Sequence, residues 1–271
     1  MCELLGMSFN KPIRPRFAFA GLKSNSDYHC DGWGLAYYPE SSKSAVIFKE
    51  PIAACDSQLA SFLLNYDQIK SNTFIGHIRR ASIGNNSHSN THPFSRVYNK
   101  REWTFAHNGS LHGLRSINEG LSYLPLGQTD SEKAFCILLT EIKAQGLRPQ
   151  GKKNSYTQRQ FKAIHQILQS INTIGDGAFN CIFSDSENLF CYRAKKTKNP
   201  LKNLYKYLRS RPFREVILRD SDLEIDLNIV KDDNEAGYII ATEKLTDEEW
   251  TTFQPGQMIV FRNGKIVSDV I

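Results

Sequence analysis

The sequence of 271 residues lacks any long apolar run and any leader-like start. No stretch of about eighteen consecutive apolar residues occurs, so the sequence predicts no transmembrane helix. Lys11, Arg14 and Arg16 fall within the first twenty residues with no apolar block behind them, which is unlike a secretory signal. From these absences we expect no membrane partner and a cytoplasmic location.

Paired cysteines and nucleotide-binding motifs are also missing. The six cysteines show no CxxC spacing, and they lie at positions 2, 30, 55, 136, 181 and 191. Such scatter fits a reduced protein better than a disulfide scaffold, and it argues against a structural zinc site. The P-loop and dinucleotide-binding signatures are absent as well.

Acidic residues are missing from the stretch 193–214, which holds nine lysines and arginines and contributes to a net charge of +6. Tyr192, Tyr205 and Tyr207 lie in or beside it, so one hypothesis is a nucleic-acid-binding surface that stacks bases on these rings. The stretch 220–235 then holds seven acids, and the two blocks can neutralise each other. The acidic block therefore argues against an open basic groove.

The remaining composition is that of an ordinary globular protein, with 40% hydrophobic and 23% charged residues. Short β-branched or aromatic segments bounded by turn residues predict strands over Met1–Ser8, Gly34–Tyr38, Ala45–Phe48, Thr73–Ile78 and Trp103–His107. Near the end, Asn263-Gly264 separates 258–261 from 265–267 and predicts a hairpin with a type I′ turn.

Three segments have the apolar spacing of helices. After a cap at Asp56, the first has an apolar face of Leu59, Phe62, Leu63, Tyr66 and Ile69. The second begins at Thr129, which has capping-box spacing to Glu132, and its apolar face is Phe135, Leu138, Leu139 and Ile142. The third covers 158–172 and directs Phe161, Ile164, Leu168 and Ile171 inward.

Strands come first, helices occupy the middle, and strands return from Ala178 onward. This order predicts an α+β protein with two sheets covered by helices, because the regular alternation of doubly wound folds is missing. The polar stretch 145–156 reads as an internal loop, so we expect a single domain over 2–271.

Cys2 is the first candidate for chemistry. A small second residue usually allows removal of Met1, which would leave Cys2 with a free α-amine. The amine has a pKa of about 7.7 to 8.0 and can accept the proton of a thiol with a pKa of about 8.5. One residue would then supply both nucleophile and base, although a small second residue also occurs by chance.

Three further motifs each have a functional and an ordinary interpretation. Arg79 follows a predicted strand and could grip a carboxylate through two hydrogen bonds, or belong to a surface basic cluster. Asn108 and Gly109 could donate to an oxyanion, or form a hairpin turn. Asp130 could bind an amine, or either Thr129 or Asp130 could simply cap the helix.

Taken together, the motifs resemble those of the class II glutamine amidotransferases, and in particular their small stand-alone bacterial form. The resemblance rests on the order and spacing of Met1-Cys2, Asp31-Gly32-Trp33-Gly34, Gly76-His77-Ile78-Arg79, Thr91-His92-Pro93-Phe94, His107-Asn108-Gly109 and Thr129-Asp130-Ser131-Glu132. It is strongest over 1–140 and continues through 178–184 and 238–262. The fold it implies is a four-layer αββα sandwich of the N-terminal nucleophile hydrolase type.

The resemblance also implies the role of each motif residue. Cys2 would be the nucleophile and base, and Asn108 with Gly109 would form the oxyanion hole. Arg79 and Asp130 would bind the α-carboxylate and α-amine of glutamine. Two further residues, Ser82 and His92, would line the pocket or order its loops.

In the implied reaction, a γ-glutamyl thioester forms on Cys2 and water releases glutamate, with no metal or organic cofactor. An acceptor domain for the ammonia is not evident in the sequence. Three substrate readings stay open: a glutaminase, a subunit that passes ammonia to a protein partner, and a hydrolase of another γ-glutamyl compound. The fold could also survive as an interaction module, which the intact motifs disfavour. No oligomeric state is predicted.

Overall fold

The structure is a computed structural model, and it describes residues 2–18, 31–66, 68–79, 85–117, 119–151, 154–195, 203–210, 217–219, 224–226 and 234–271. Ser82, the start of the first predicted strand at Met1 and much of the basic and acidic stretches lie outside these ranges. The description that follows concerns the described residues.

One sheet is built around the first strand of the chain. Its seven strands are, in spatial order, β14 (Thr251–Thr252), β10 (Tyr205–Ser210), β13 (Ala236–Ala241), β1 (Glu3–Ile13), β5 (Ser71–Arg79), β3 (Gly32–Tyr37) and β4 (Val46–Glu50). All neighbouring pairs run antiparallel. The N-terminal strand is therefore central in its sheet.

The second sheet has six strands and is also antiparallel. Its spatial order is β16 (Lys265–Val270), β15 (Met258–Arg262), β9 (Leu189–Tyr192), β8 (Ala178–Ser184), β7 (Arg101–Ser110) and β6 (Phe94–Tyr98). The predicted hairpin is confirmed, because Asn263 and Gly264 join β15 to β16 with φ of 48° and 68°. Positive φ at both central residues is what a type I′ turn requires.

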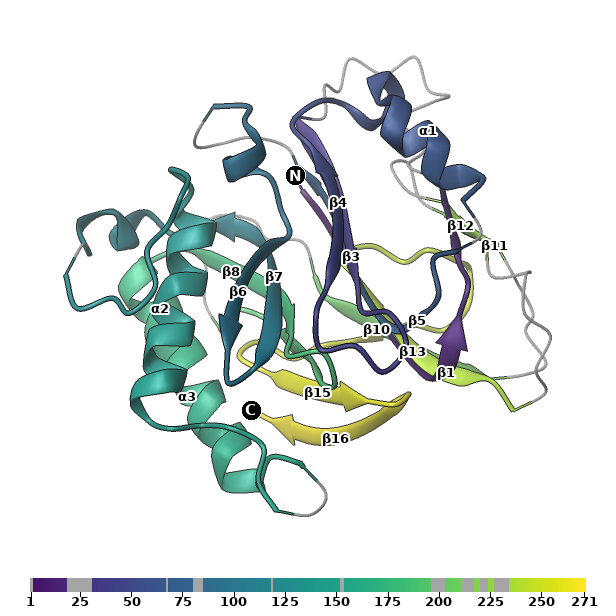
Figure 1. Ribbon diagram of the computed structural model, residues 1–271. Helices are drawn as coiled ribbons and strands as arrows, with labels where there is room; N and C mark the ends of the chain where they lie inside the picture. Colours follow the sequence, from purple (N-terminus) through teal and green to yellow (C-terminus); the bar gives the residue numbers. More distant parts are fainter. Residues whose placement is uncertain are drawn as a thin grey trace.

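The two sheets pack face to face, with helices outside them (Figure 1). Leu4 and Ile75 of one sheet share a buried cluster with Ala106 and Ile182 of the other. Helices α2 (Asp130–Ala144) and α3 (Gln158–Gly175) cover the outer face of the six-stranded sheet. The opposite outer layer contains α1 (Gln58–Leu64) and a small sheet of β11 (Ile217–Arg219), β12 (Glu224–Asp226) and β2 (Arg16–Ala18).

The apolar faces of the two long helices are confirmed. Phe135, Leu138, Leu139 and Ile142 of α2 are fully buried, and the four residues expected of α3 are buried as well. Thr129 is the N-cap of α2 and accepts a hydrogen bond from the backbone of Glu132. The reciprocal half of the predicted capping box is not formed, because the Glu132 carboxylate accepts hydrogen bonds from Leu126 and Gly127 instead.

The prediction for α1 was partly wrong. Its N-cap is Ser57, whose hydroxyl accepts from the backbone of Ala60, and not Asp56. The helix ends at Leu64, so the expected stripe does not extend to Ile69. Phe62 was expected inward but its side chain is 56% exposed.

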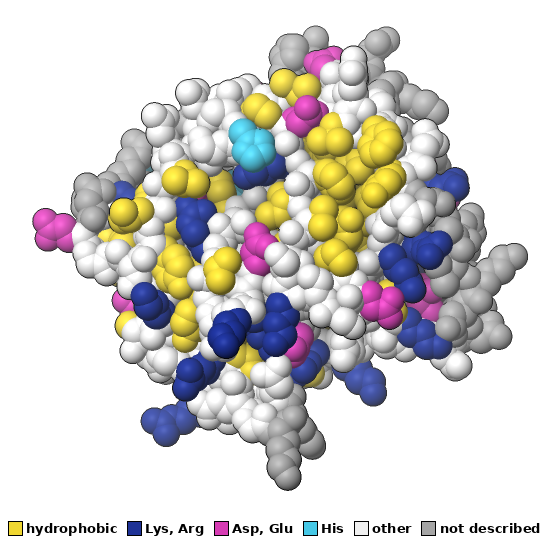
Figure 2. Space-filling view, viewed as in Figure 1, with side chains coloured by type: hydrophobic (Ala, Val, Ile, Leu, Met, Phe, Trp, Pro, Cys, Tyr) yellow, Lys and Arg dark blue, Asp and Glu magenta, His cyan; other side chains and the backbone are white. Residues whose placement is uncertain are grey.

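Apolar side chains are exposed on the surface near α1. Figure 2 shows hydrophobic side chains gathered where β3 and β4 lie in Figure 1. Ile52, two residues after β4, is 42% exposed, and Phe62 on α1 is also exposed.

Among the helices of the described ranges, none is both long enough and apolar enough to cross a membrane.

Short 3-10 helices complete the connections that matter for the site. They are η1 (Ala54–Asp56), η2 (His88–Asn90) and η3 (His112–Ser116). η2 lies between β5 and β6, and η3 follows β7. η3 therefore begins two residues after β7, which carries Asn108 and Gly109, and η2 ends two residues before His92.

Candidate active site

Strand register brings the predicted residues of the seven-stranded sheet to one end. β1 pairs with β5 so that Glu3 lies opposite Ile78. β3 pairs with β5 so that Gly32 lies opposite Arg79. Cys2 precedes Glu3, so it lies at the end of the sheet where β5 ends with Arg79.

The second sheet supplies Asn108 to the same end. Asn108 lies near the end of β7, and its Nδ2 donates a hydrogen bond to the carbonyl oxygen of Cys2 at 2.6 Å. Asn108 is buried, with a relative exposure of 3%. This contact joins residues that are 106 positions apart in the sequence.

The Asn108-Gly109 dipeptide is not a hairpin turn. Both residues continue β7, where Asn108 lies opposite Asn180 and Gly109 opposite Phe179 in β8. Gly109 has φ of 145°, and a Cβ at this position would clash with the carbonyl oxygen of Ala178. A glycine is required here because β8 begins directly against the backbone.

Arg79 is buried and held in a polar chain. Its Nη1 donates to Oδ1 of Asn86 at 2.9 Å, and Nδ2 of Asn86 donates to Oδ1 of Asp31 at 3.2 Å. Burial lowers the pKa of Arg79, while electrostatic interactions with Asp31 and Cys2 oppose that shift. A guanidinium remains charged even so, because its ordinary pKa is above about 12. The site therefore holds a buried positive charge next to Cys2.

Asp130 occupies the first turn of α2 and faces the end of β7. Its Oδ2 accepts a hydrogen bond from the backbone of Leu111 at 2.5 Å. His107 lies beside it, with Nδ1 2.8 Å from the hydroxyl of Ser131 and Nε2 3.0 Å from the carbonyl oxygen of Ala178. Burial lowers the pKa of His107, and the charge of Asp130 opposes this shift. The Asp130 carboxylate therefore sits at the N-terminus of α2, against the backbone that follows β7.

His92 lies in the interior between the sheets. Its ring centroid is 4.1 Å from that of His77 and 4.5 Å from that of Phe94. Burial lowers the pKa of His92 well below its ordinary value and that of His77 to about 3. Among the described residues, neither ring nitrogen of His92 has a hydrogen-bond partner. The imidazole is thus a neutral packing group, and its pocket role stays a prediction.

A family model for class-II glutamine amidotransferases matches residues 1–270. The chain belongs to the class-II glutamine amidotransferases. A protein of Methanocaldococcus jannaschii, MJ1515, is 40% identical over 98% of this chain and 71% of its own length. YafJ of Escherichia coli is 36% identical over 98% of this chain and 100% of its own.

Solved structures agree with this family and fold. A structure described as a predicted glutamine amidotransferase from Pseudomonas aeruginosa PA01 has a TM-score of 0.77 at 34% identity, covering 98% of this chain and 99% of that one. Glutamine PRPP amidotransferase from Bacillus subtilis has a TM-score of 0.60 at 16% identity, covering 99% of this chain and 48% of that one. The second likeness shows the shared fold alone. The expected αββα sandwich is confirmed.

Sequence reasoning missed the amides that support the site. Asn86 bonds both Arg79 and Asp31. Asn90 is 1% exposed, and it bonds Asn85 in its own loop and Gln128 in another. The run from Asn85 to Asn90 contains three asparagines in six residues, which was the available signal. Asparagine is also common in simple loops, so composition alone could not assign a role.

A glycine and a lysine help to bring separate motifs together. A Cβ on Gly34 of β3 would clash with the carbonyl oxygen of His92. Lys49 of β4 donates to the carbonyl oxygens of Thr91 at 2.8 Å and Pro93 at 3.3 Å. Burial lowers the pKa of Lys49 to about 8. The segment around His92 is therefore clamped against β3 and β4.

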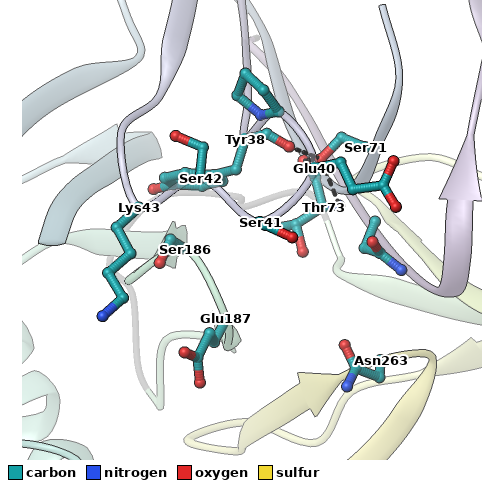
Figure 3. Close-up of a pocket in the computed structure, with 12 residues that line it drawn as sticks. Tyr38, Glu40, Ser41, Ser42, Lys43, Ser71, Thr73, Ser186, Glu187 and Asn263 are labelled. Atoms are coloured by element: carbon teal, nitrogen blue, oxygen red, sulfur yellow. Dashed lines mark hydrogen bonds between the residues drawn. The ribbon is translucent and has the colours of Figure 1, made fainter.

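A polar cavity of about 200 Å³ lies at the opposite end of the sheets from Cys2 (Figure 3). Its lining includes Tyr38 after β3 and Glu187 in the turn between β8 and β9. Glu187 forms ion pairs with Arg101 at 2.8 Å and Arg262 at 2.5 Å. The charge of Glu187 is thus balanced by two arginines of the same chain. None of the predicted site residues lines this cavity.

The described part of the basic stretch does not form a stacking surface. Tyr192 is fully buried, which contradicts the base-stacking role proposed for it from sequence. Tyr205 and Tyr207 pack partly buried against the core of the seven-stranded sheet. Arg209 is 1% exposed and lies 3.7 Å from the carboxylate of Glu248. Burial of these side chains disfavours the nucleic-acid hypothesis.

Proposed function

We propose that this chain hydrolyses the γ-amide of glutamine with Cys2 as nucleophile and the α-amine of Cys2 as base. Membership of the class-II glutamine amidotransferases supports glutamine as the substrate. The reaction would release ammonia and then glutamate through a γ-glutamyl thioester. Removal of Met1 is part of the proposal, because an amide nitrogen cannot act as the base.

The observation that carries the proposal is the contact between Asn108 and Cys2. The Asn108 side chain crosses from the six-stranded sheet to the Cys2 carbonyl oxygen at 2.6 Å. Its amide therefore stands beside the nucleophilic residue, where an oxyanion would form. Each well-placed donor of this kind contributes about 3 kcal/mol to transition-state stabilisation.

The charges of the site suit an α-amino acid. Arg79 is positive and buried near Cys2, and Asp130 is held at the N-terminus of α2. In the proposal Arg79 binds the α-carboxylate and Asp130 binds the α-amine. A zwitterion held at both ends would have one orientation, which presents its γ-amide to Cys2.

The proposed steps balance in atoms and protons. The Cys2 thiol gives its proton to the α-amine, and the thiolate attacks the carbonyl carbon of the γ-amide. Asn108 and Gly109 donate to the oxyanion, and the amine passes the proton to departing ammonia. Water then gives a proton to the amine while its oxygen attacks the thioester. The returning proton restores the Cys2 thiol as glutamate leaves.

Another γ-glutamyl compound could bind through the same two grips, and the released ammonia could pass to a protein partner. A panel of γ-glutamyl amides and peptides separates these readings from simple glutamine hydrolysis. Equal amounts of free ammonia and glutamate from glutamine alone would support a glutaminase. A much faster γ-glutamyl compound would identify that compound as the substrate.

The test compares processed protein with the Cys2→Ala variant and with protein that retains Met1. We expect the processed protein to release ammonia and glutamate, and both other samples to lose at least about 1,000-fold in rate. Mass spectrometry defines the N-terminus of each sample. Equal release by Cys2→Ala would refute the nucleophile, and full activity with Met1 retained would refute the amine base.

A further inference from the structure

The two proposed substrate grips belong to different segments that meet at one buried side chain. Arg79 ends β5 and is held by Asn86 in the segment that follows, whereas Asp130 begins α2 after another loop. The distance between the grips is therefore set by how these two segments are joined. A ligand held at both ends is sensitive to this distance.

Asn90 joins the two segments with both ends of its amide. Its Nδ2 donates to Oδ1 of Asn85 at 2.7 Å and to the carbonyl oxygen of Asn85 at 3.1 Å. Its Oδ1 accepts from the backbone of Gln128 at 2.7 Å. Asn85 precedes Asn86, and Gln128 lies two residues before Asp130. A continuous path thus runs between the grips through one side chain.

The packing around Asn90 leaves little room for another arrangement. A Cβ on Gly127 would clash with Oδ1 of Asn90, so the second loop approaches η2 closely. The carboxylate of Glu132 accepts from the backbone of Gly127 at 2.6 Å and from Arg96 at 2.6 Å. Glu132 is 1% exposed, and the loop is therefore fixed from both sides.

We propose that Asn90 is a positioning residue that sets the spacing between Arg79 and Asp130, and thereby selects substrates with both an α-carboxylate and an α-amine. This inference rests on the proposed function. Asn90 acts through Asn86 and Gln128, and it does not need to touch the substrate. Its effect should therefore fall on recognition of the doubly held ligand.

The experiment uses the full-length processed protein with two amide substrates. Glutamine carries both handles, whereas glutaramate has the same carboxylate and terminal amide but no α-amine. The variants are Asn90→Ala, which removes both sets of hydrogen bonds, and Asn90→Asp, which keeps the acceptor for Gln128 but loses the donors to Asn85. Asn188→Ala is the matched control, since Asn188 is equally buried and bonds Asp185 in the turn between β8 and β9.

We expect Asn90→Ala to lower kcat/KM for glutamine by about 30-fold or more, mainly through KM, because small displacements of positioning groups are costly. The kcat/KM for glutaramate should stay within about threefold, so the preference for glutamine collapses. Asn90→Asp should lose part of the preference, and Asn188→Ala should retain it. Circular dichroism and thermal unfolding confirm that each variant is folded.

Two results would overturn the inference. Equal losses for glutamine and glutaramate would mean that Asn90 has a general structural role, and an unchanged preference would mean that it has no role in spacing. Wild-type protein that hydrolyses neither glutamine nor any γ-glutamyl amide would instead overturn the proposed function, and the inference would fall with it.

Discussion

At the scale of single residues, the same dipeptide has two structural fates in this chain. Asn263-Gly264 forms the turn between β15 and β16, whereas Asn108-Gly109 continues β7 beside β8. Local sequence cannot separate them, because the decision depends on β8, which begins about seventy residues later. Asn108 stays in a strand through that long-range pairing, and its side chain contacts Cys2.

The two asparagines provide a matched test of the proposed oxyanion role. Asn108→Ala should lower kcat for glutamine by roughly 100- to 1,000-fold, since one donor to the oxyanion is lost. Its stability should fall by about 1 kcal/mol, because the bond to the Cys2 carbonyl oxygen is lost as well.

Asn263→Ala is the control for this prediction. Asn263 has φ of 48°, so alanine there should cost about 1 kcal/mol of stability. Its kcat should match the wild type, since the turn is remote from Cys2. Steady-state kinetics and urea unfolding measure both quantities. A wild-type kcat in Asn108→Ala would contradict the oxyanion role.

At the scale of elements, the long helices were predictable and the short one was not. α2 and α3 extend over 15 and 18 residues, so their apolar stripes repeat enough to define a face. α1 has 7 residues, and its stripe was wrongly extended to residues beyond its end. Packing by neighbouring elements decides the orientation of so short a helix.

Adjacent residues of α1 test this orientation. Leu63 is 1% exposed and belongs to the core beneath the seven-stranded sheet, whereas Phe62 is 56% exposed. Leu63→Ala should cost about 2 to 4 kcal/mol of unfolding free energy through the lost burial and the cavity. Phe62→Ala should cost less than about 1 kcal/mol. Urea unfolding compares them, and similar costs would mean that α1 is rotated from its described position.

Only one of the two hydrogen bonds predicted for the capping box of α2 is formed. Thr129 caps the helix as predicted, but the carboxylate of Glu132 bonds the preceding loop and Arg96. Arg96 comes from β6, which is distant in sequence, so the competition could not be read locally. The diverted carboxylate now braces the loop that leads to Asp130.

At the scale of the whole molecule, sequence patterns predicted the two covered sheets, but they did not predict which motifs lie close together in space. Strand and helix patterns predicted two covered sheets, because burial periodicity is a local property. The approach of Asn108 to Cys2 depends on the packing of one sheet on the other. The resemblance to a family anticipated that meeting, whereas the bracing role of Asn90 required the loops to be placed in space.

The buried histidines make the whole molecule sensitive to acid. Burial lowers the pKa of His77 to about 3, and it lowers the pKa of His92 and His107 as well. Between pH 6.5 and pH 3 the imidazole of His77 is protonated in the unfolded chain but neutral in the folded protein. Stability therefore decreases as the pH falls through this window.

From pH 7 to pH 5, His77 alone should cost about 2 kcal/mol of unfolding free energy, given an unfolded pKa of 6.5. His92 and His107 act in the same direction, so the measured loss should exceed this value. Urea unfolding at pH 7, 6 and 5 gives the slope, and NMR of the imidazole protons follows each histidine in the folded protein. An imidazole of His77 that titrates near pH 6.5 in the folded protein would contradict the prediction, because the folded and unfolded states would then bind protons nearly alike.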